Sequence, residues 1–136
     1  MSINTTPIFV GTPHASWVTT GTSANTNLDG TGTVATAFTA GTNGSRIEKV
    51  ILQHLGSNTD TVIRLFVNNG SSNTTATNNS LVYEVALVAN SLSQTAASTR
   101  VEVALDMVLP PGYKLNCTTG TAIAAGVQVT AVGGDY

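Results

Sequence analysis

Charged side chains are scarce in this chain of 136 residues. Only 9% of the residues are Asp, Glu, Lys or Arg, against roughly 25% in ordinary globular domains. The formal net charge is −2 and the five cations form no cluster, which argues against nucleic acid as a partner. A surface of Thr, Asn, Ser and Gly costs little to cover, because few charges lose water when a subunit binds. The composition therefore favours a protein that assembles.

Cysteine is almost absent as well, and Cys117 cannot form a disulfide within the chain. It alternates with Tyr113 and Leu115, which places it on the buried face of a strand rather than at a reactive site. The N-terminal residues lack the basic and apolar regions of a signal peptide. No apolar run approaches the roughly 20 residues of a membrane span, so we expect no membrane partner.

Helical periodicity is also missing, because no segment places apolar residues at i, i+3, i+4 and i+7 over a helical length with caps. Short alternating or apolar runs recur instead, with turn residues about every 8–12 residues. They predict eight or nine short strands. The expected strands are Pro7–Val10, Ser16–Thr20, Val34–Thr39, Arg46–Leu55, Thr61–Asn68, Leu81–Val88, Arg100–Leu105, Tyr113–Thr118 and Ala122–Val132.

This strand pattern is typical of a β-sandwich or a Greek-key barrel. The polar links Asn68–Ser80 and Asn90–Ser98 suit crossings between two sheets better than a meander. We therefore expect an all-β fold: a single-domain antiparallel β-sandwich, jelly-roll-like, over residues 16–136. Residues 1–15 are expected to form an N-terminal arm or an edge segment.

Two local features lead to specific predictions. Asn43-Gly44 can occupy backbone positions with φ > 0 and lies between Val34–Thr39 and Arg46–Leu55, which predicts that these segments pair as a hairpin. Arg64 lies in the middle of an apolar run. We expect it to form an ordinary ion pair with Glu48 or Glu84, with a subunit contact as the alternative.

The sequence holds no spacing typical of a catalytic or metal site. His14 and His54 are far apart, and there is no HxxxH, CxxC or paired-carboxylate pattern. Asp29-Gly30-Thr31-Gly32 lacks the further carboxylates of a calcium loop, so we expect a tight turn in which Asp29 caps its own backbone. The expectation is a non-enzymatic protein with no cofactor and no metal.

Several sequence blocks match a known pattern together. They are Asn27, Asp29–Thr33, Phe38–Gly41, Asn43–Ile47, Arg64–Phe66, Leu109–Tyr113 and Gly133–Tyr136. With these blocks the chain resembles a family of small structural proteins of tailed bacteriophages. The resemblance spans nearly the whole chain and rests on turn-rich motifs. The links Asn68–Ser80 and Asn90–Ser98 depart from the family pattern.

The resemblance implies a jelly-roll virion protein made in the host cytoplasm. The function it favours is that of a capsid decoration or cement protein, a homotrimer that binds the phage major capsid protein on the outer surface of the head. Two alternatives stay open: a tail, fibre or neck component, and a carbohydrate-binding β-sandwich module with two or three aromatic rings exposed together. The candidate subunit or capsid contacts are Phe9, Trp17, Arg46, Glu48, Arg64, Asn73 and Asn78.

Overall fold

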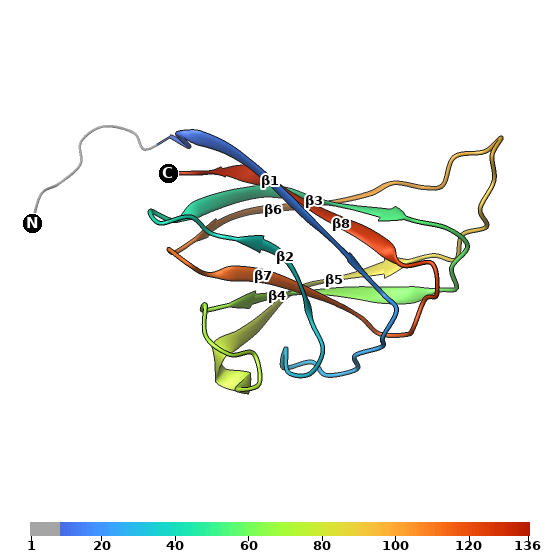
Figure 1. The fold of residues 1–136 in the computed structure, drawn as a ribbon, viewed down its shortest axis with the longest axis horizontal. Helices are drawn as coiled ribbons and strands as arrows, with labels where there is room; N and C mark the ends of the chain where they lie inside the picture. The colour runs from blue at the N-terminus through green and yellow to red at the C-terminus, as the bar shows by residue number, and fades with distance from the viewer. Residues whose placement is uncertain (1–8) are drawn as a thin grey trace, which may run out of the picture.

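The computed structural model describes residues 9–136, which form two four-stranded antiparallel sheets packed face to face (Figure 1). The elements are β1 (Thr12–Thr20), β2 (Ala35–Thr39), β3 (Ser45–His54), β4 (Thr61–Asn68), the 3₁₀ turn η1 (Ala76–Asn78), β5 (Asn79–Leu87), β6 (Val101–Leu109), β7 (Lys114–Thr119) and β8 (Val127–Asp135). No helix in this part of the chain is long and apolar enough to cross a membrane.

The strand order is β1-β8-β3-β6 in one sheet, called sheet A, and β2-β7-β4-β5 in the other, called sheet B. This order is that of a jelly roll, in which two Greek keys are wound into a double sheet. The predicted all-β antiparallel sandwich is therefore confirmed. Of the two long polar links, the one after β5 does cross between sheets, since β5 lies in sheet B and β6 lies in sheet A. The link between β4 and β5 does not, because both strands lie in sheet B.

The core lies between the two sheets and is filled by alternate residues of their strands. On β3, for example, Ile47 and Leu52 are fully buried, and on β4 so are Ile63 and Leu65. The largest fully buried side chains are Phe38, Phe66, Ile47, Leu52, Ile63, Leu65, Leu87, Leu109, Leu115, Ile123, Val50 and Val127. At about 25 cal/mol for each Å² of apolar surface, their burial is the main source of stability.

The hairpin predicted around Asn43-Gly44 is wrong. β2 pairs with β7 in sheet B, whereas β3 pairs with β6 and β8 in sheet A. The turn itself exists, with Gly44 at φ +87° and its N–H donating to Gly41 O at an N–O distance of 3.1 Å. A turn fixes a change of direction and not a pairing partner. With β2 and β3 in opposite sheets, the apolar faces of both strands are buried against one core.

The N-terminal strand prediction also needs correction. One strand, β1, replaces the two candidates and pairs with β8 along its whole length. Residues 1–8, and with them the beginning of the Pro7–Val10 candidate, lie outside the described residues. The segment 1–15 expected as an arm or an edge thus contributes Thr12–Ala15 to an edge strand.

The outer face of sheet B carries a cover made by residues 21–34 and residues 69–78, which are joined to each other and to the sheet. Asn73 donates to Gly32 O at 2.8 Å, and Asn25 N donates to Thr119 O at 2.8 Å. Phe66 is fully buried although it does not belong to the cluster between the sheets. We attribute its burial to this cover.

Candidate functional site

Three of the seven predicted contact residues meet around one hollow. Phe9, Arg46 and Glu48 line it together with Val10 and Tyr136, and its volume is about 370 Å³. It is called the terminal hollow below. The neighbouring strands β1, β8 and β3 bring these residues together, so both ends of the described chain lie at this end of the sandwich (Figure 1).

The terminal hollow mixes aromatic and charged groups. Phe9 is 79% exposed. Arg46 Nη2 lies 3.0 Å from Asp106 Oδ1 in an exposed ion pair, which contributes at most about 1 kcal/mol. Glu48 is exposed where the pairing of β3 shifts by one residue, and it forms no ion pair with another described residue. Such a surface suits a protein partner, with an apolar anchor and charges at its rim.

Beside the hollow, Asp135 accepts hydrogen bonds from two side chains that are distant in sequence. The Ser45 hydroxyl donates to Asp135 Oδ1, and His14 Nδ1 lies 2.9 Å from the same oxygen. These bonds, that of Ser45 above all, hold the pKa of the Asp135 carboxyl below its usual range, although desolvation opposes the shift. The three residues tie β1, β3 and β8 together.

These residues are a serine, a histidine and an aspartate, yet they lack the geometry of a hydrolytic triad. In such a triad the serine hydroxyl bonds to the imidazole. Here Ser45 donates to Asp135 instead, accepts a hydrogen bond from Gly41 N at 2.9 Å, and is fully buried. His14 packs its ring against Phe38, with ring centroids 4.2 Å apart. The arrangement fixes strands and does not activate a nucleophile.

Trp17, the fourth predicted contact residue, lies on β1 away from the terminal hollow. It is 65% exposed on the outer face of sheet A, opposite Thr130 of β8. The other exposed ring, Tyr83, lies on β5 at an edge of sheet B. Phe9, Trp17 and Tyr83 therefore come from three separate parts of the surface, and no observation here favours a carbohydrate platform.

Arg64 forms the predicted cross-strand ion pair, and its partner is Glu84. Arg64 Nε lies 2.7 Å from Glu84 Oε1, and Arg64 Nη1 lies 3.4 Å from Asn25 O. The arginine side chain is only 15% exposed. Arg64 therefore holds part of the cover on sheet B, and little of it is left to contact another subunit.

The two predicted asparagine contacts are also used inside the protein. Asn73 Nδ2 donates to Gly30 O at 3.2 Å and to Gly32 O at 2.8 Å. Asn78 Nδ2 donates to Ser72 O at 2.8 Å within the β4–β5 link. Because their amides bond to backbone carbonyls, both residues order the loop, and whether they also contact a partner stays a prediction.

The turn at Asp29 behaves as the sequence predicted. Asp29 Oδ1 accepts hydrogen bonds from Thr31 N at 3.0 Å and from Thr31 Oγ1 at 2.6 Å, and these bonds lower the pKa of the Asp29 carboxyl. The backbone oxygens of this turn accept hydrogen bonds from side-chain amides: those of Gly30 and Gly32 from Asn73, and that of Asp29 from Asn79. These oxygens are therefore already bonded within the protein.

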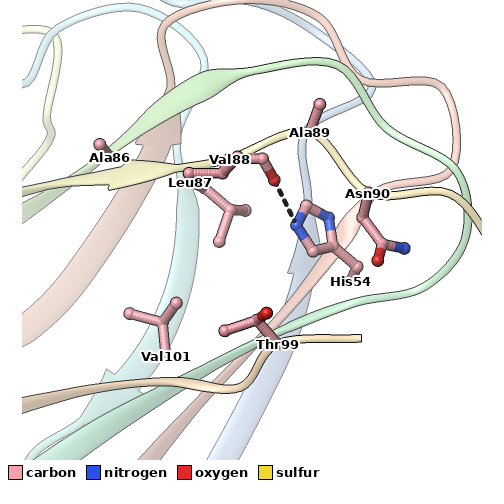
Figure 2. Close-up of a pocket in the computed structure, with 8 residues that line it drawn as sticks. All are labelled: His54, Ala86, Leu87, Val88, Ala89, Asn90, Thr99 and Val101. Carbon is pink, nitrogen blue, oxygen red and sulfur yellow. Dashed lines mark hydrogen bonds between the residues drawn. The ribbon is translucent and has the colours of Figure 1, made fainter. Parts of the chain in front are cut away.

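A second hollow, of about 260 Å³, lies at the opposite end between β5 and the start of β6 (Figure 2). His54 lies at its inner wall. Its Nε2 is 3.0 Å from Val88 O, and its Nδ1 is 3.0 Å from Asn58 Nδ2. Since Asn58 Nδ2 can only donate, Nδ1 is the acceptor and Nε2 carries the proton. Both ring nitrogens therefore form hydrogen bonds, one to the β5–β6 link at Val88 and one to the β3–β4 link at Asn58.

Cys117 is fully buried in the core, as its alternation with Leu115 predicted, and its Sγ lies 3.4 Å from Ala35 O. Burial raises the pKa of the thiol to about 12. Within residues 9–136, no group of three or more His, Cys, Asp or Glu side chains could hold a metal ion. A reactive thiol or a metal centre thus has no support among the described residues.

Sequence reasoning missed the roles of Asp135 and Tyr136, although Gly133-Gly134 before them was an available signal. A β carbon on Gly133 would lie 1.8 Å from Arg46 O, and one on Gly134 would lie 1.9 Å from Val10 Cγ1. The two glycines allow β3 and the segment leading into β1 to approach the end of β8 closely.

Comparisons with known proteins found no matching family model, no matching curated protein and no matching solved structure.

Proposed function

We propose that this chain is a non-enzymatic virion structural protein, a decoration or cement protein that binds the assembled head of a tailed phage as a homotrimer. The proposal rests on the resemblance of several sequence blocks to those of phage structural proteins, and on where these blocks lie in the fold. A decoration protein needs a rigid scaffold and a binding surface, and it needs no titrating centre.

The observation that carries the proposal is the convergence of separate blocks at one end of the sandwich. Asn43 Nδ2 donates to Tyr136 O at 3.3 Å, and Tyr136 N donates to Gly44 O at 3.2 Å. Ala40 N donates to Tyr113 O at 2.8 Å. Four blocks of the resemblance, at residues 38–41, 43–47, 109–113 and 133–136, therefore build the end that carries the terminal hollow.

The terminal hollow is accordingly the proposed capsid-binding surface. Phe9 supplies an exposed aromatic anchor, and Arg46 and Glu48 supply charges at its border. Contacts of this size are weak singly. Repeated by the symmetry of a trimer on a lattice, they add to high avidity, and a bridge between neighbouring capsomers opposes their separation.

Cosedimentation tests the proposal directly. The purified full chain is mixed with heads that lack it, taken from the phage that encodes the chain, and Phe9→Ala and Glu48→Arg are compared with wild type. Wild type is expected to pellet with the heads, and each variant to bind at least about tenfold more weakly at an unchanged unfolding midpoint. Thr22→Ala, an exposed change just beyond the far end of β1, is the matched control.

Labelling of intact virions distinguishes the other structural role. A tagged chain located on the head agrees with decoration. Label confined to the tail, fibres or neck contradicts it and assigns the chain to that class. If wild type does not bind heads and the chain is absent from purified virions, both the decoration role and the tail, fibre or neck role are contradicted.

A further inference from the structure

A third hollow lies where the chain passes from β1 in sheet A to β2 in sheet B, and it is called the hydroxyl hollow below. Its volume is about 120 Å³. Figure 1 shows the β1–β2 link leaving the end of β1 and reaching β2 in the other sheet. This link, the strand ends beside it and β7 supply the walls. Six of the nine lining residues carry a hydroxyl group: Thr19, Thr20, Thr22, Ser23, Thr33 and Thr118.

Thr118 supplies a polar group that the protein itself leaves without a partner. Its residue is only 2% exposed. Within residues 9–136, Thr118 Oγ1 is the one buried side-chain oxygen or nitrogen that forms no hydrogen bond. Leaving a buried hydroxyl without a partner costs free energy. An unpartnered hydroxyl at the wall of a hollow therefore indicates a place where a bound molecule supplies the partner.

The alternation of β7 shows that Thr118 lines the hollow with its side chain. Gly120 N, just after β7, donates to Val62 O of β4 at 2.9 Å. Thr119 O instead accepts from Asn25 N of the β1–β2 link at 2.8 Å. Successive residues of a strand direct their backbone groups to opposite sides, so those of Thr118 are directed to β4, as those of Gly120 are. The hollow lies on the other side, where the side chain is the part of Thr118 that can reach it.

Hydrogen bonds fix the walls of the hydroxyl hollow. Gly21 O accepts from Ile123 N at 2.7 Å, and Ser23 O accepts from Thr119 Oγ1 at 3.3 Å. Glycine is needed at position 21, because a β carbon there would lie 2.5 Å from Ile123 Cγ1 and the φ is +116°. A hollow with fixed walls is formed before its ligand arrives, so binding costs little ordering of the protein.

The lining determines the chemistry of the ligand. None of the nine lining residues is charged, so an ion would lose water without gaining a counter-charge. A purely apolar molecule would leave Thr118 Oγ1 without a partner. A hydroxyl group both donates and accepts, so another hydroxyl group complements it. At roughly 30 Å³ for each water molecule, the hollow has room for about four waters, or for a group of the same size that bears several hydroxyls.

We propose that the hydroxyl hollow binds a neutral molecule through vicinal hydroxyl groups, as presented by a free polyol or by one unit of a sugar chain. One of these hydroxyls forms a hydrogen bond with Thr118 Oγ1. Thr19, Thr22 and Thr33 are exposed, so the hollow is open to solvent and the rest of a sugar chain can extend away from the protein. None of the lining residues is aromatic, so this site differs from the platform of exposed rings considered above.

This site does not depend on the proposed function. Thr19 and Thr20 end β1, whereas Phe9 and Val10 of the terminal hollow precede its start. The two hollows are therefore different surfaces. Loss of head binding and loss of polyol or sugar binding can be observed independently.

NMR titration tests the site and distinguishes the two sources of the ligand. The isotopically labelled full chain is titrated separately with glycerol and with the methyl glycosides of glucose, galactose and mannose. Saturable shifts are expected at the amides of Thr20, Ser23 and Thr118. Tighter binding of glycerol assigns the site to a free polyol, and tighter binding of a glycoside assigns it to a sugar unit. The absence of a saturable shift with all four probes, as for a hollow that takes only water, overturns the proposal.

Thr118→Val removes the hydroxyl and keeps the branched shape of the side chain. Binding of the tightest probe should weaken at least about tenfold, while the urea midpoint should not fall, because no hydrogen bond within the protein is lost. Thr119→Val is the matched control for stability: its hydroxyl donates to Ser23 O, so its midpoint should fall. A folded Thr118→Val that binds as wild type does, or one whose midpoint falls as far as that of Thr119→Val, overturns the proposal.

Discussion

Asn73 directs its side-chain amide at one turn, with Nδ2 lying 3.2 Å from Gly30 O and 2.8 Å from Gly32 O. This single side chain joins the β4–β5 link to the β1–β2 link over the outer face of sheet B. This chain has few charged residues, and hydrogen bonds from asparagine amides thus connect segments that ion pairs connect in other proteins.

Asn73→Ala should therefore lower the free energy of unfolding by about 1–3 kcal/mol, because two backbone carbonyls lose their donor. Asn73→Asp should cost at least as much, since a carboxylate would face both carbonyls. Urea denaturation measures the change. Thr77→Ala, in the same link but exposed, should change stability by less than about 0.5 kcal/mol. Equal effects of N73A and T77A would contradict the role given to Asn73.

Gly133→Ala should be the most damaging small substitution at the end of β8. Its β carbon would lie 1.8 Å from Arg46 O, and that backbone cannot move without breaking the β3–β8 ladder. We expect a loss of about 3 kcal/mol or more. Gly112→Ala is a useful contrast, because its β carbon meets nothing within 4 Å and only the φ of +73° is strained. That change should cost about 1–2 kcal/mol, and thermal denaturation should rank the two variants in this order.

Asp135 should give the fold an acid-sensitive component. Its pKa is lowered in the folded state by the bonds from Ser45 and His14. The carboxylate therefore stabilises the fold above its unfolded pKa of about 3.9, and this contribution is lost as the pH falls through the folded-state value. The difference in unfolding free energy between wild type and Asp135→Asn should shrink as the pH falls below about pH 4. A difference that grows on acidification would contradict this assignment.

Cys117 should be inert in the folded protein. Thiolates and not thiols react with disulfide reagents, and burial raises the pKa of this thiol to about 12. At about pH 8 the native protein should react at least about 100-fold more slowly than the protein in urea. Absorbance of the chromophore that the reagent releases measures both rates. Rapid reaction of the native chain would show that the core around β7 opens readily.

Much of this architecture could be predicted from local patterns. Alternation in Thr61–Asn68 predicted a strand, and the turn chemistry of Asp29 predicted a turn, and the structure contains both. Whether β2 and β3 pair with each other could not be predicted in this way. A turn at Asn43-Gly44 is compatible both with a hairpin and with a crossing of the chain from one sheet to the other. Only the need to bury both strands against one core decides between them.

The site depended still more on the tertiary structure. Phe9, Arg46 and Glu48 were proposed as separate contacts, and the order β1-β8-β3 places them around one hollow with Tyr136. Asn73 and Asn78 were proposed on the same grounds, yet their amides bond to carbonyls within the chain. Sequence identifies polar residues in a loop, whereas their hydrogen-bonding partners come from segments that only folding brings near.

The sequence by itself determined that this protein is an all-β sandwich with an almost uncharged surface, because strand alternation and turn residues act over a few positions and composition needs no fold. The tertiary structure alone decided which strands pair and which glycines allow close approach. These depend on contacts between residues such as His14 and Asp135, which are 121 positions apart in the chain. The local propensities of single segments carry no information about such contacts. Burial of the strands against a common core determines them.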